Sequence, residues 1–239
     1  MKKLLLITLL TLLCHVMQAS DYLRFAEEGK VWHMQYSLPA PIYGQYSTEY
    51  YYDYFVKGDT VVGNRPCKKL YSFNHSNSGK TELRMVIFEE NRKVYSMVGT
   101  QPKLIFDFGA EVGDEIEIED ESNTTTTYYV HEVKQVMING ISRRAIGIST
   151  EADFGPWGWW VEGIGTVPCM EAPYFTLIDI VGNTTSLNSC ELKGKLIWFK
   201  SDLAIVWGNS QPSINADVNS DGVVDIDDVN LVIKTMLHK

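Results

Sequence analysis

Three kinds of feature are missing from this sequence of 239 residues, and each absence excludes a class of protein. Lys and Arg number 21 against 30 Asp and Glu, giving a formal net charge of −9, so the basic surface of a non-specific nucleic-acid-binding protein is missing. No G-x-G-x-x-G, P-loop, G-x-S-x-G or H-E-x-x-H motif occurs, so nucleotide-binding folds and these two hydrolase types are unsupported. Beyond the N-terminal segment, no stretch has the run of about 20 apolar residues that spans a membrane.

Helical periodicity is also scarce. Between Asp21 and Gly208, no window of ten residues or more places its apolar residues on one helical face. Short alternations of apolar and polar residues fill this region instead, and turn residues separate them. Apolar residues make up 45% of the chain and aromatic residues 12%, which suits a β-rich core. We therefore predict an all-β domain over residues 20–208, an antiparallel meander folded as a barrel or a sandwich.

Turn signals within this region predict where hairpins reverse. Gly, Asn, Asp and Pro cluster at 57–59, 63–66, 90–92 and 139–140, and Gly194 lies inside the last alternating stretch. Each cluster separates two apolar–polar alternations, so each is predicted to join two neighbouring strands.

The first 19 residues have the pattern of a signal peptide. Met1-Lys2-Lys3 is a basic start, Leu4 to Leu13 is an apolar run of ten residues, and Ala19 is a small residue at a cleavage position. We expect cleavage near Ala19 and a secreted, extracellular or periplasmic location. A lipoprotein signal at Cys14 is the alternative, although Leu13 before it is not small.

Removing this segment leaves Cys67, Cys169 and Cys190. Three cysteines in an exported chain allow one disulfide. Cys169 and Cys190 form the favoured pair, because both lie in one β-rich stretch, and three buried thiols are the alternative. Cys67 precedes Lys68, and a basic neighbour is expected to lower the pKa of a thiol. The sequence does not show a histidine next to this thiol that could act as its base. A structural role for Cys67 is therefore favoured.

The sequence does not single out a set of catalytic residues. Acids that glycoside hydrolysis would require are abundant, including Glu89, Glu90, Asp107, Asp153 and Glu162, and nothing in the sequence selects a pair. Trp157, Trp159 and Trp160 lie between glycines, and their rings could form a stacking platform for sugars. The alternative is a turn whose tryptophans cover the core. A polysaccharide-active or carbohydrate-binding function through Trp157–Glu162 is therefore a secondary hypothesis.

The body of the chain resembles a β-rich domain of unknown function that is common in secreted proteins of Bacteroidota. The resemblance rests on Gly58–Gly63 with Lys68–Tyr71, on Leu104–Phe108 with Val112–Asp114, and on Trp160–Gly165. It covers most of residues 50–200. Its motifs are turn-and-strand patterns. The resemblance therefore implies where the protein is located more than which reaction it catalyses.

Residues 209–239 are predicted to form a second module, in which a linker-like stretch precedes a calcium loop and a helix. Between 217 and 228, oxygen-bearing residues recur at loop positions 1, 3, 5, 9 and 12 with Gly222 at position 6, which is EF-hand spacing. Ca²⁺ prefers six to eight oxygen ligands, and the glycine permits the turn that aims them inward. The predicted calcium ligands are Asp217, Asn219, Asp221, Val223 through its carbonyl, Asp225 and Asp228.

The residues after this loop predict a helix. Val229, Val232, Ile233 and Met236 share one helical face. No helix precedes the loop, so the module resembles a single dockerin type I repeat rather than a full EF-hand. Dockerins carry two repeats, and the familiar Ser-Thr pair is replaced here by Ile226 and Asp227. The resemblance implies a cohesin-like or surface protein as partner, bound through the helix. Packing of the helix on the β-rich body is the alternative.

Together these features predict a secreted or surface-associated calcium-binding protein with a non-enzymatic binding or assembly role. Its expected partners include a protein and, under the secondary hypothesis, a glycan, but no nucleic acid.

Overall fold

The computed structural model describes residues 22–38, 48–75, 79–120, 123–167 and 184–208. The chain divides into two compact units, Met1–Leu203 and Ala204–Lys239. All described strands belong to the first unit. In the second unit the described residues are 204–208, which contain most of the short helix α2 (Leu203–Val206).

The larger of two antiparallel sheets has eight strands in the spatial order β13-β12-β1-β2-β3-β4-β5-β6. Each strand from β1 to β5 pairs with its successor, and β1 also pairs with β12. Their bounds are β1 (Lys30–Leu38), β2 (Thr48–Val62), β3 (Arg65–Asn74), β4 (Thr81–Glu90), β5 (Lys93–Val98), β6 (Gln101–Asp107), β12 (Thr184–Leu192) and β13 (Lys195–Phe199).

The smaller sheet has five strands in the order β11-β10-β9-β8-β7. They are β7 (Glu115–Glu119), β8 (Thr125–Ile138), β9 (Ile141–Ser149), β10 (Gly158–Val161) and β11 (Gly165–Val167). A single 3₁₀ turn, η1 (Lys200–Asp202), follows β13. The predicted all-β antiparallel class is confirmed for the described residues.

The turn signals place most hairpins correctly. Asn139 and Gly140 join β8 to β9 with φ values of 51° and 73°, and Asn91 and Arg92 join β4 to β5 with φ values of 53° and 62°. Two successive positive φ values match the right-handed twist of a two-residue hairpin, which is why Asn and Gly are favoured there. The predicted turns at 63–66 and at Gly194 also join consecutive strands.

One predicted turn is wrong. Residues 57–59 do not reverse the chain, because β2 continues through them and stays paired with β3 on both sides. The register shifts between Val56 and Asp59, and Gly58 has a φ of 81°, so the segment is a β-bulge. A glycine in a strand marks a bulge as readily as a turn, and the sequence pattern alone does not separate them.

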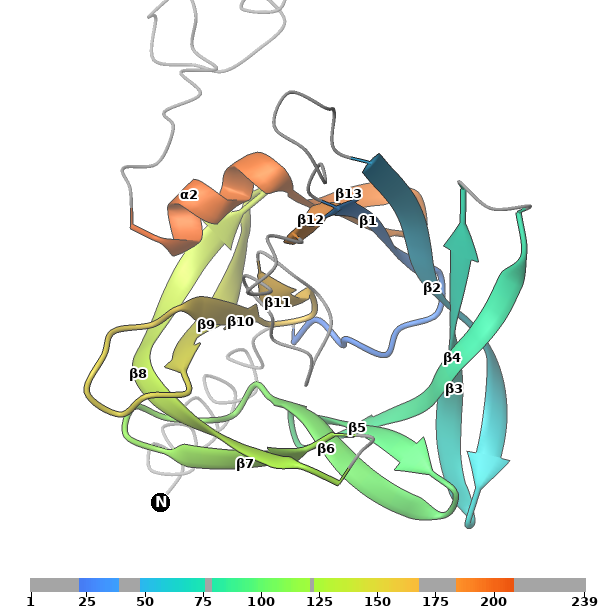
Figure 1. Ribbon diagram of the computed structural model, residues 1–239, viewed down its shortest axis with the longest axis horizontal. Helices are drawn as coiled ribbons and strands as arrows, with labels where there is room; N and C mark the ends of the chain where they lie inside the picture. The colour runs from blue at the N-terminus through green and yellow to red at the C-terminus, as the bar shows by residue number, and fades with distance from the viewer. Residues whose placement is uncertain (1–21, 39–47, 76–78, 121–122, 168–183, 209–239) are drawn as a thin grey trace, which may run out of the picture. The chain divides into compact units, whose positions relative to one another are not determined.

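The two sheets curve around a shared interior (Figure 1). The indole N–H of Trp32 on β1 donates to the carbonyl oxygen of Ile164, in the β10–β11 turn, at 2.7 Å. The ring of Phe106 on β6 meets Trp160 on β10 edge to face, with 5.8 Å between centroids. All four side chains are buried, so aromatic packing joins the larger sheet to the smaller one.

Several predictions lie outside the described residues. They are the signal peptide at 1–19, the calcium loop at 217–228 and the helix at 229–237, and all stay predictions. Cys169 also lies outside the described residues. Within the described part of the chain, no helix has the length and apolar character needed to cross a membrane.

Candidate functional site

The three tryptophans predicted as a platform do not share one exposed surface. Trp157 is 38% exposed, whereas Trp159 and Trp160 are each 1% exposed. Strand β10 pairs with β9 on one side and β11 on the other, and all four of its residues are buried. The platform hypothesis is therefore wrong for Trp159 and Trp160, which fill the core as the alternative interpretation held.

The predicted acids fall into three environments. Glu90 and Asp153 are exposed, and neither lies in a described hollow. Asp107 is 8% exposed, and its carboxylate accepts the backbone N–H of Gly109 at 3.0 Å and pairs with Lys93 at 2.9 Å. These contacts fix the turn after β6. Glu89 and Glu162 meet in a different place, around the N-terminal segment formed by residues 22–26.

Glu89, near the end of β4, holds the middle of the N-terminal segment. Its two carboxylate oxygens accept the backbone N–H groups of Phe25 and Ala26, each at 3.2 Å. The phenol of Tyr22 also donates to this carboxylate. Burial and the adjacent Glu89 carboxylate raise the pKa of Tyr22, so the phenol keeps its proton. All three donors belong to the N-terminal segment.

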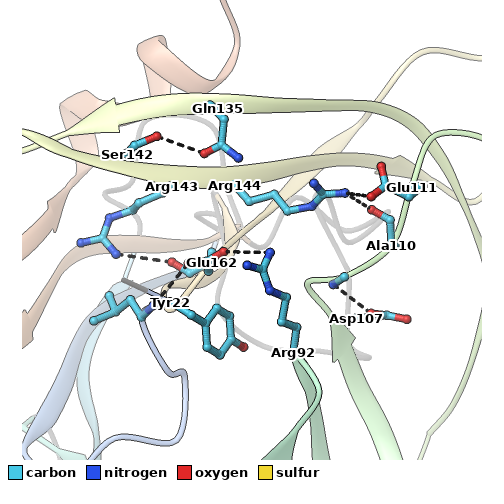
Figure 2. A network of polar contacts seen from close by, with 12 residues as sticks. Tyr22, Arg92, Asp107, Ala110, Glu111, Gln135, Ser142, Arg143, Arg144 and Glu162 are labelled. Carbon is cyan, nitrogen blue, oxygen red and sulfur yellow. Dashed lines mark hydrogen bonds and ion pairs between the residues drawn. The ribbon is translucent and has the colours of Figure 1, made fainter. Parts of the chain in front are cut away.

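Glu162, in the β10–β11 turn, holds the start of the same segment (Figure 2). Its Oε1 accepts the backbone N–H of Leu23 at 3.3 Å, and its Oε2 lies 3.9 Å from Nη1 of Arg92. The Arg92 guanidinium also stacks 5.4 Å from the ring centroid of Tyr22. Burial raises the pKa of Glu162, and the Leu23 N–H with the neighbouring arginines partly offsets that rise.

Two cations are buried beside this network. Lys30 is 0% exposed, and its ammonium donates to the carbonyl oxygens of Arg24 and Gly163, the latter at 2.8 Å. Burial lowers the pKa of Lys30 to about 8. Arg143 is 1% exposed and donates from Nη1 to the carbonyl oxygen of Glu162 at 3.5 Å. Arg144, next to it, reaches outward to Glu111 at 2.8 Å (Figure 2).

This interior network is built to hold backbone rather than to receive a ligand. Glu89 and Glu162 are a pair of acids that the sequence could not single out, and the fold brings both to one segment. Glycoside hydrolysis requires two carboxyl groups that face a sugar across a cleft. Here both carboxylates accept hydrogen bonds from the chain's own N–H groups, which makes them a clamp on the N-terminal segment.

Cys67 lines a hollow of about 220 Å³ with Arg24, Asp59, Lys68 and Glu89 among its neighbours. The side chain is 3% exposed, and burial raises the pKa of its thiol, so the expected lowering by basic neighbours is wrong. The ammonium group of Lys68 pairs with the carboxylate of Asp59, with 2.6 Å between Nζ and Oδ1. Cys67 and Cys190 are both buried free thiols, in agreement with the alternative to a disulfide. The predicted Cys169–Cys190 disulfide is therefore wrong, because the thiol of Cys190 is free.

A third cluster opens outward on the larger sheet. Alternation along β1 and β2 points Trp32 and Tyr54 inward, so their neighbours His33 and Asp53, which face each other in register, point outward. Nδ1 of His33 lies 2.6 Å from Oδ1 of Asp53. Nε2 of His75, just after β3, lies 2.8 Å from Oδ2 of the same carboxylate. The three side chains form one His33–Asp53–His75 cluster.

This cluster lines an open hollow of about 340 Å³, called here the outer hollow, together with Met34, Tyr51, Tyr52 and Asn188. The sequence gives no signal for it, because its residues come from three strands, β1, β2 and β12, and from the end of β3. Only the strand register brings them together. Among the described residues, no three His, Cys, Asp or Glu side chains are arranged to hold a metal ion.

The chain matches no known protein-family model, no curated protein and no solved structure.

Proposed function

We propose that this chain is an exported calcium-binding protein with a non-enzymatic binding or assembly role. The observation that carries the proposal is the loop spacing in the sequence. The proposed ligands are Asp217, Asn219, Asp221, the carbonyl of Val223, Asp225 and Asp228. Five oxygen-bearing side chains at the EF-hand positions, with a glycine at the sixth, suit a hard divalent cation.

The contacts of the β-rich body favour binding over catalysis. Glu89 and Glu162, the acids that the fold brings together, are engaged by backbone N–H groups of residues 23, 25 and 26. The alternative function, polysaccharide binding or processing through Trp157–Glu162, loses most of its support, because Trp159, Trp160 and Glu162 are buried.

The proposed partner of the C-terminal module is a cohesin-like or surface protein. Calcium would order the loop and thereby the helix that follows it, and the face of Val229, Val232, Ile233 and Met236 would then meet the partner. Asp227 and Asp228 lie at the start of that helix, where negative charge is favoured.

Calorimetry with CaCl₂ on the chain without residues 1–19 tests the calcium site. We expect a single site whose heat disappears in the double variant Asp217→Ala/Asp221→Ala. The matched control removes two acids from an exposed stretch of the body, Glu151→Ala/Asp153→Ala, and is expected to bind calcium like the wild type. Circular dichroism is expected to show a calcium-dependent gain of helix in the wild type alone. Equal calcium heats in the wild type and the Asp217→Ala/Asp221→Ala variant would refute the proposal.

A further inference from the structure

The outer hollow presents hydrogen-bond acceptors from its central cluster. An ionised aspartate only accepts hydrogen bonds, so each ring nitrogen facing Asp53 must carry its hydrogen. His33 therefore donates from Nδ1 and His75 from Nε2. In the neutral ring of His75, Nδ1 is then an acceptor, whereas Nε2 of His33 lies 3.9 Å from Oε1 of Glu191. Each oxygen of Asp53 keeps a further lone pair, so Asp53 and His75 together offer three acceptor positions.

The chemical complement of such a surface is a group of adjacent hydrogen-bond donors. His75 has 47% of its side chain exposed, and Asp53 has 23%, so these acceptors are accessible to a ligand. A metal ion would also suit oxygen and nitrogen acceptors, but no three of these side chains converge in a metal-binding arrangement in the described chain. An organic molecule with several hydroxyl groups on neighbouring atoms supplies such a group of donors.

The rest of the lining suits the carbon face of the same ligand. Tyr51 lines the hollow and is 44% exposed, and its hydroxyl is held by Glu49 at 2.7 Å, which fixes the ring in place. An aromatic face packs on the apolar C–H surface of a sugar ring. Asn188, which donates to Gln35 at 3.3 Å, adds a polar side chain to the lining.

Charge selects among sugars. Asp53 lines the hollow, Glu49 accepts the hydroxyl of the lining residue Tyr51, and Glu191 lies 3.9 Å from Nε2 of His33. A uronic acid would bring another negative charge into this surface and would be repelled, whereas a neutral or an amino sugar would not.

We propose that the outer hollow is a saccharide-binding site for neutral or amino sugars, with Asp53 and His75 accepting the sugar hydroxyls and Tyr51 stacking on the ring. The volume of about 340 Å³ accommodates one to two sugar units. The lining of this site contains no residue of the Trp157–Glu162 region or of the calcium loop. The saccharide site can therefore be tested independently of the proposed function.

Saturation-transfer NMR with defined disaccharides tests the site on the chain without residues 1–19. The probes are cellobiose, xylobiose, mannobiose and diglucosamine, with digalacturonic acid as the charged comparison. We expect transfer to at least one of the first four probes and none to digalacturonic acid. Asp53→Asn and Tyr51→Ala are each expected to weaken that binding by about tenfold or more, because the first replaces an acceptor oxygen by an amide donor and the second removes the stacking ring.

Three controls make the result specific. His131→Gln removes a histidine outside the hollow, which contacts Ser149 at 2.7 Å, and is expected to bind the sugar like the wild type. Trp157→Ala is expected to do the same. The Asp217→Ala/Asp221→Ala variant is also expected to bind it, which separates this proposal from the calcium site. Thermal melts identify any variant that is misfolded. If Asp53→Asn does not fold, Tyr51→Ala provides the test, because the side chain of Tyr51 is exposed.

Three outcomes would overturn the proposal. The first is no transfer to any of the four uncharged or amino probes. The second is binding that Asp53→Asn and Tyr51→Ala leave unchanged in folded protein. The third is binding that Trp157→Ala abolishes or that EDTA removes, because the ligand would then be held at another surface or through a metal ion.

Discussion

The backbone N–H of Leu23 donates to Oε1 of Glu162 at 3.3 Å, across 139 residues of sequence. Next to this contact, the carboxylate of Glu89 accepts the N–H groups of Phe25 and Ala26. A non-regular segment at the start of the described chain thus has its hydrogen bonds satisfied by two acids from opposite sheets. Buried backbone N–H groups require such partners, and here side chains supply them in place of a neighbouring strand.

Replacement of Glu89 is expected to release the N-terminal segment. Glu89→Ala leaves the Tyr22 phenol and two backbone N–H groups without their acceptor, at a cost of about 3 kcal/mol in the free energy of unfolding. The control is Glu90→Ala, which removes an exposed acid paired with Arg65 at 3.5 Å and is expected to cost less than about 0.5 kcal/mol. Urea unfolding measures both. Equal stability of the two variants would show that the clamp contributes nothing.

A side chain at Gly163 is expected to collide with the N-terminal segment. Gly163 has a φ of 72°, and an added Cβ would lie 2.6 Å from Leu23. Gly194→Ala is the matched control, because Gly194 has a φ of 76° and nothing within 4 Å of the added carbon. Gly194→Ala is expected to cost the backbone strain alone, about 1–2 kcal/mol, and Gly163→Ala clearly more. Thermal and urea unfolding of the pair isolate the collision; similar costs would contradict it.

Burial of Lys30 predicts a pH dependence of stability. Its folded-state pKa of about 8 lies below the ordinary value of 10.5. Between these pH values the unfolded chain binds more protons than the folded chain, so this residue's contribution to the free energy of unfolding rises with pH. The rise from pH 8 to pH 9 is about 1 kcal/mol. Lys30→Met removes this dependence, and the difference between wild type and variant is the quantity to measure by urea unfolding.

The wild type has to be compared with the Lys30→Met variant, because Cys190 has the opposite effect on the pH dependence of stability. Burial raises the pKa of its thiol from 9.0 to about 12, so its contribution falls as the pH rises above 9. Lys80→Met, at an exposed lysine paired with Glu82, is the control and is expected to keep the wild-type pH dependence. A Lys30→Met variant with an unchanged pH profile would show that Lys30 is not buried in its charged state.

Substitution of Trp160 is expected to lower the free energy of unfolding much more than substitution of Trp157. Trp160→Ala removes a ring that packs on Phe106 and Tyr128, and is expected to cost about 3–5 kcal/mol. Trp157→Ala removes a half-exposed ring and is expected to cost less than about 1 kcal/mol. Chemical unfolding with tryptophan-independent detection, such as circular dichroism, compares them. A large cost at Trp157 would mean that its ring is part of the core.

The fold class was predictable because hairpin turns and strand alternation are local properties. Asn139-Gly140 and Asn91-Arg92 have the backbone conformations that their residue types favour, and the alternating Glu115–Glu119 forms β7 with Ile116 and Ile118 buried. The sequence predicts a turn at Gly58 where the structure has a bulge, because a glycine with positive φ suits both. What separates them is whether the strand pairs again beyond the glycine, which depends on its partner.

The two charged clusters were not predictable, because they depend on register between distant strands. His33, Asp53 and His75 are unremarkable along the sequence, and only the pairing of β1, β2 and β3 aligns them. Lys30 is a lysine that sequence rules place at the surface, yet two carbonyl oxygens hold it inside. The tryptophan stretch was ambiguous because burial depends on whether β10 gains neighbours on both sides.

The position of β1 has a consequence for the order in which the fold can form. This strand pairs with β2 on one side and with β12 on the other. During synthesis from the N-terminus, the β12 edge of β1 stays without a partner until almost the whole described chain has been made. Such a long-range pairing slows folding and leaves an open strand edge in the meantime. Truncation before Thr184 would make that exposure permanent, and the shortened chains would be prone to edge-to-edge aggregation.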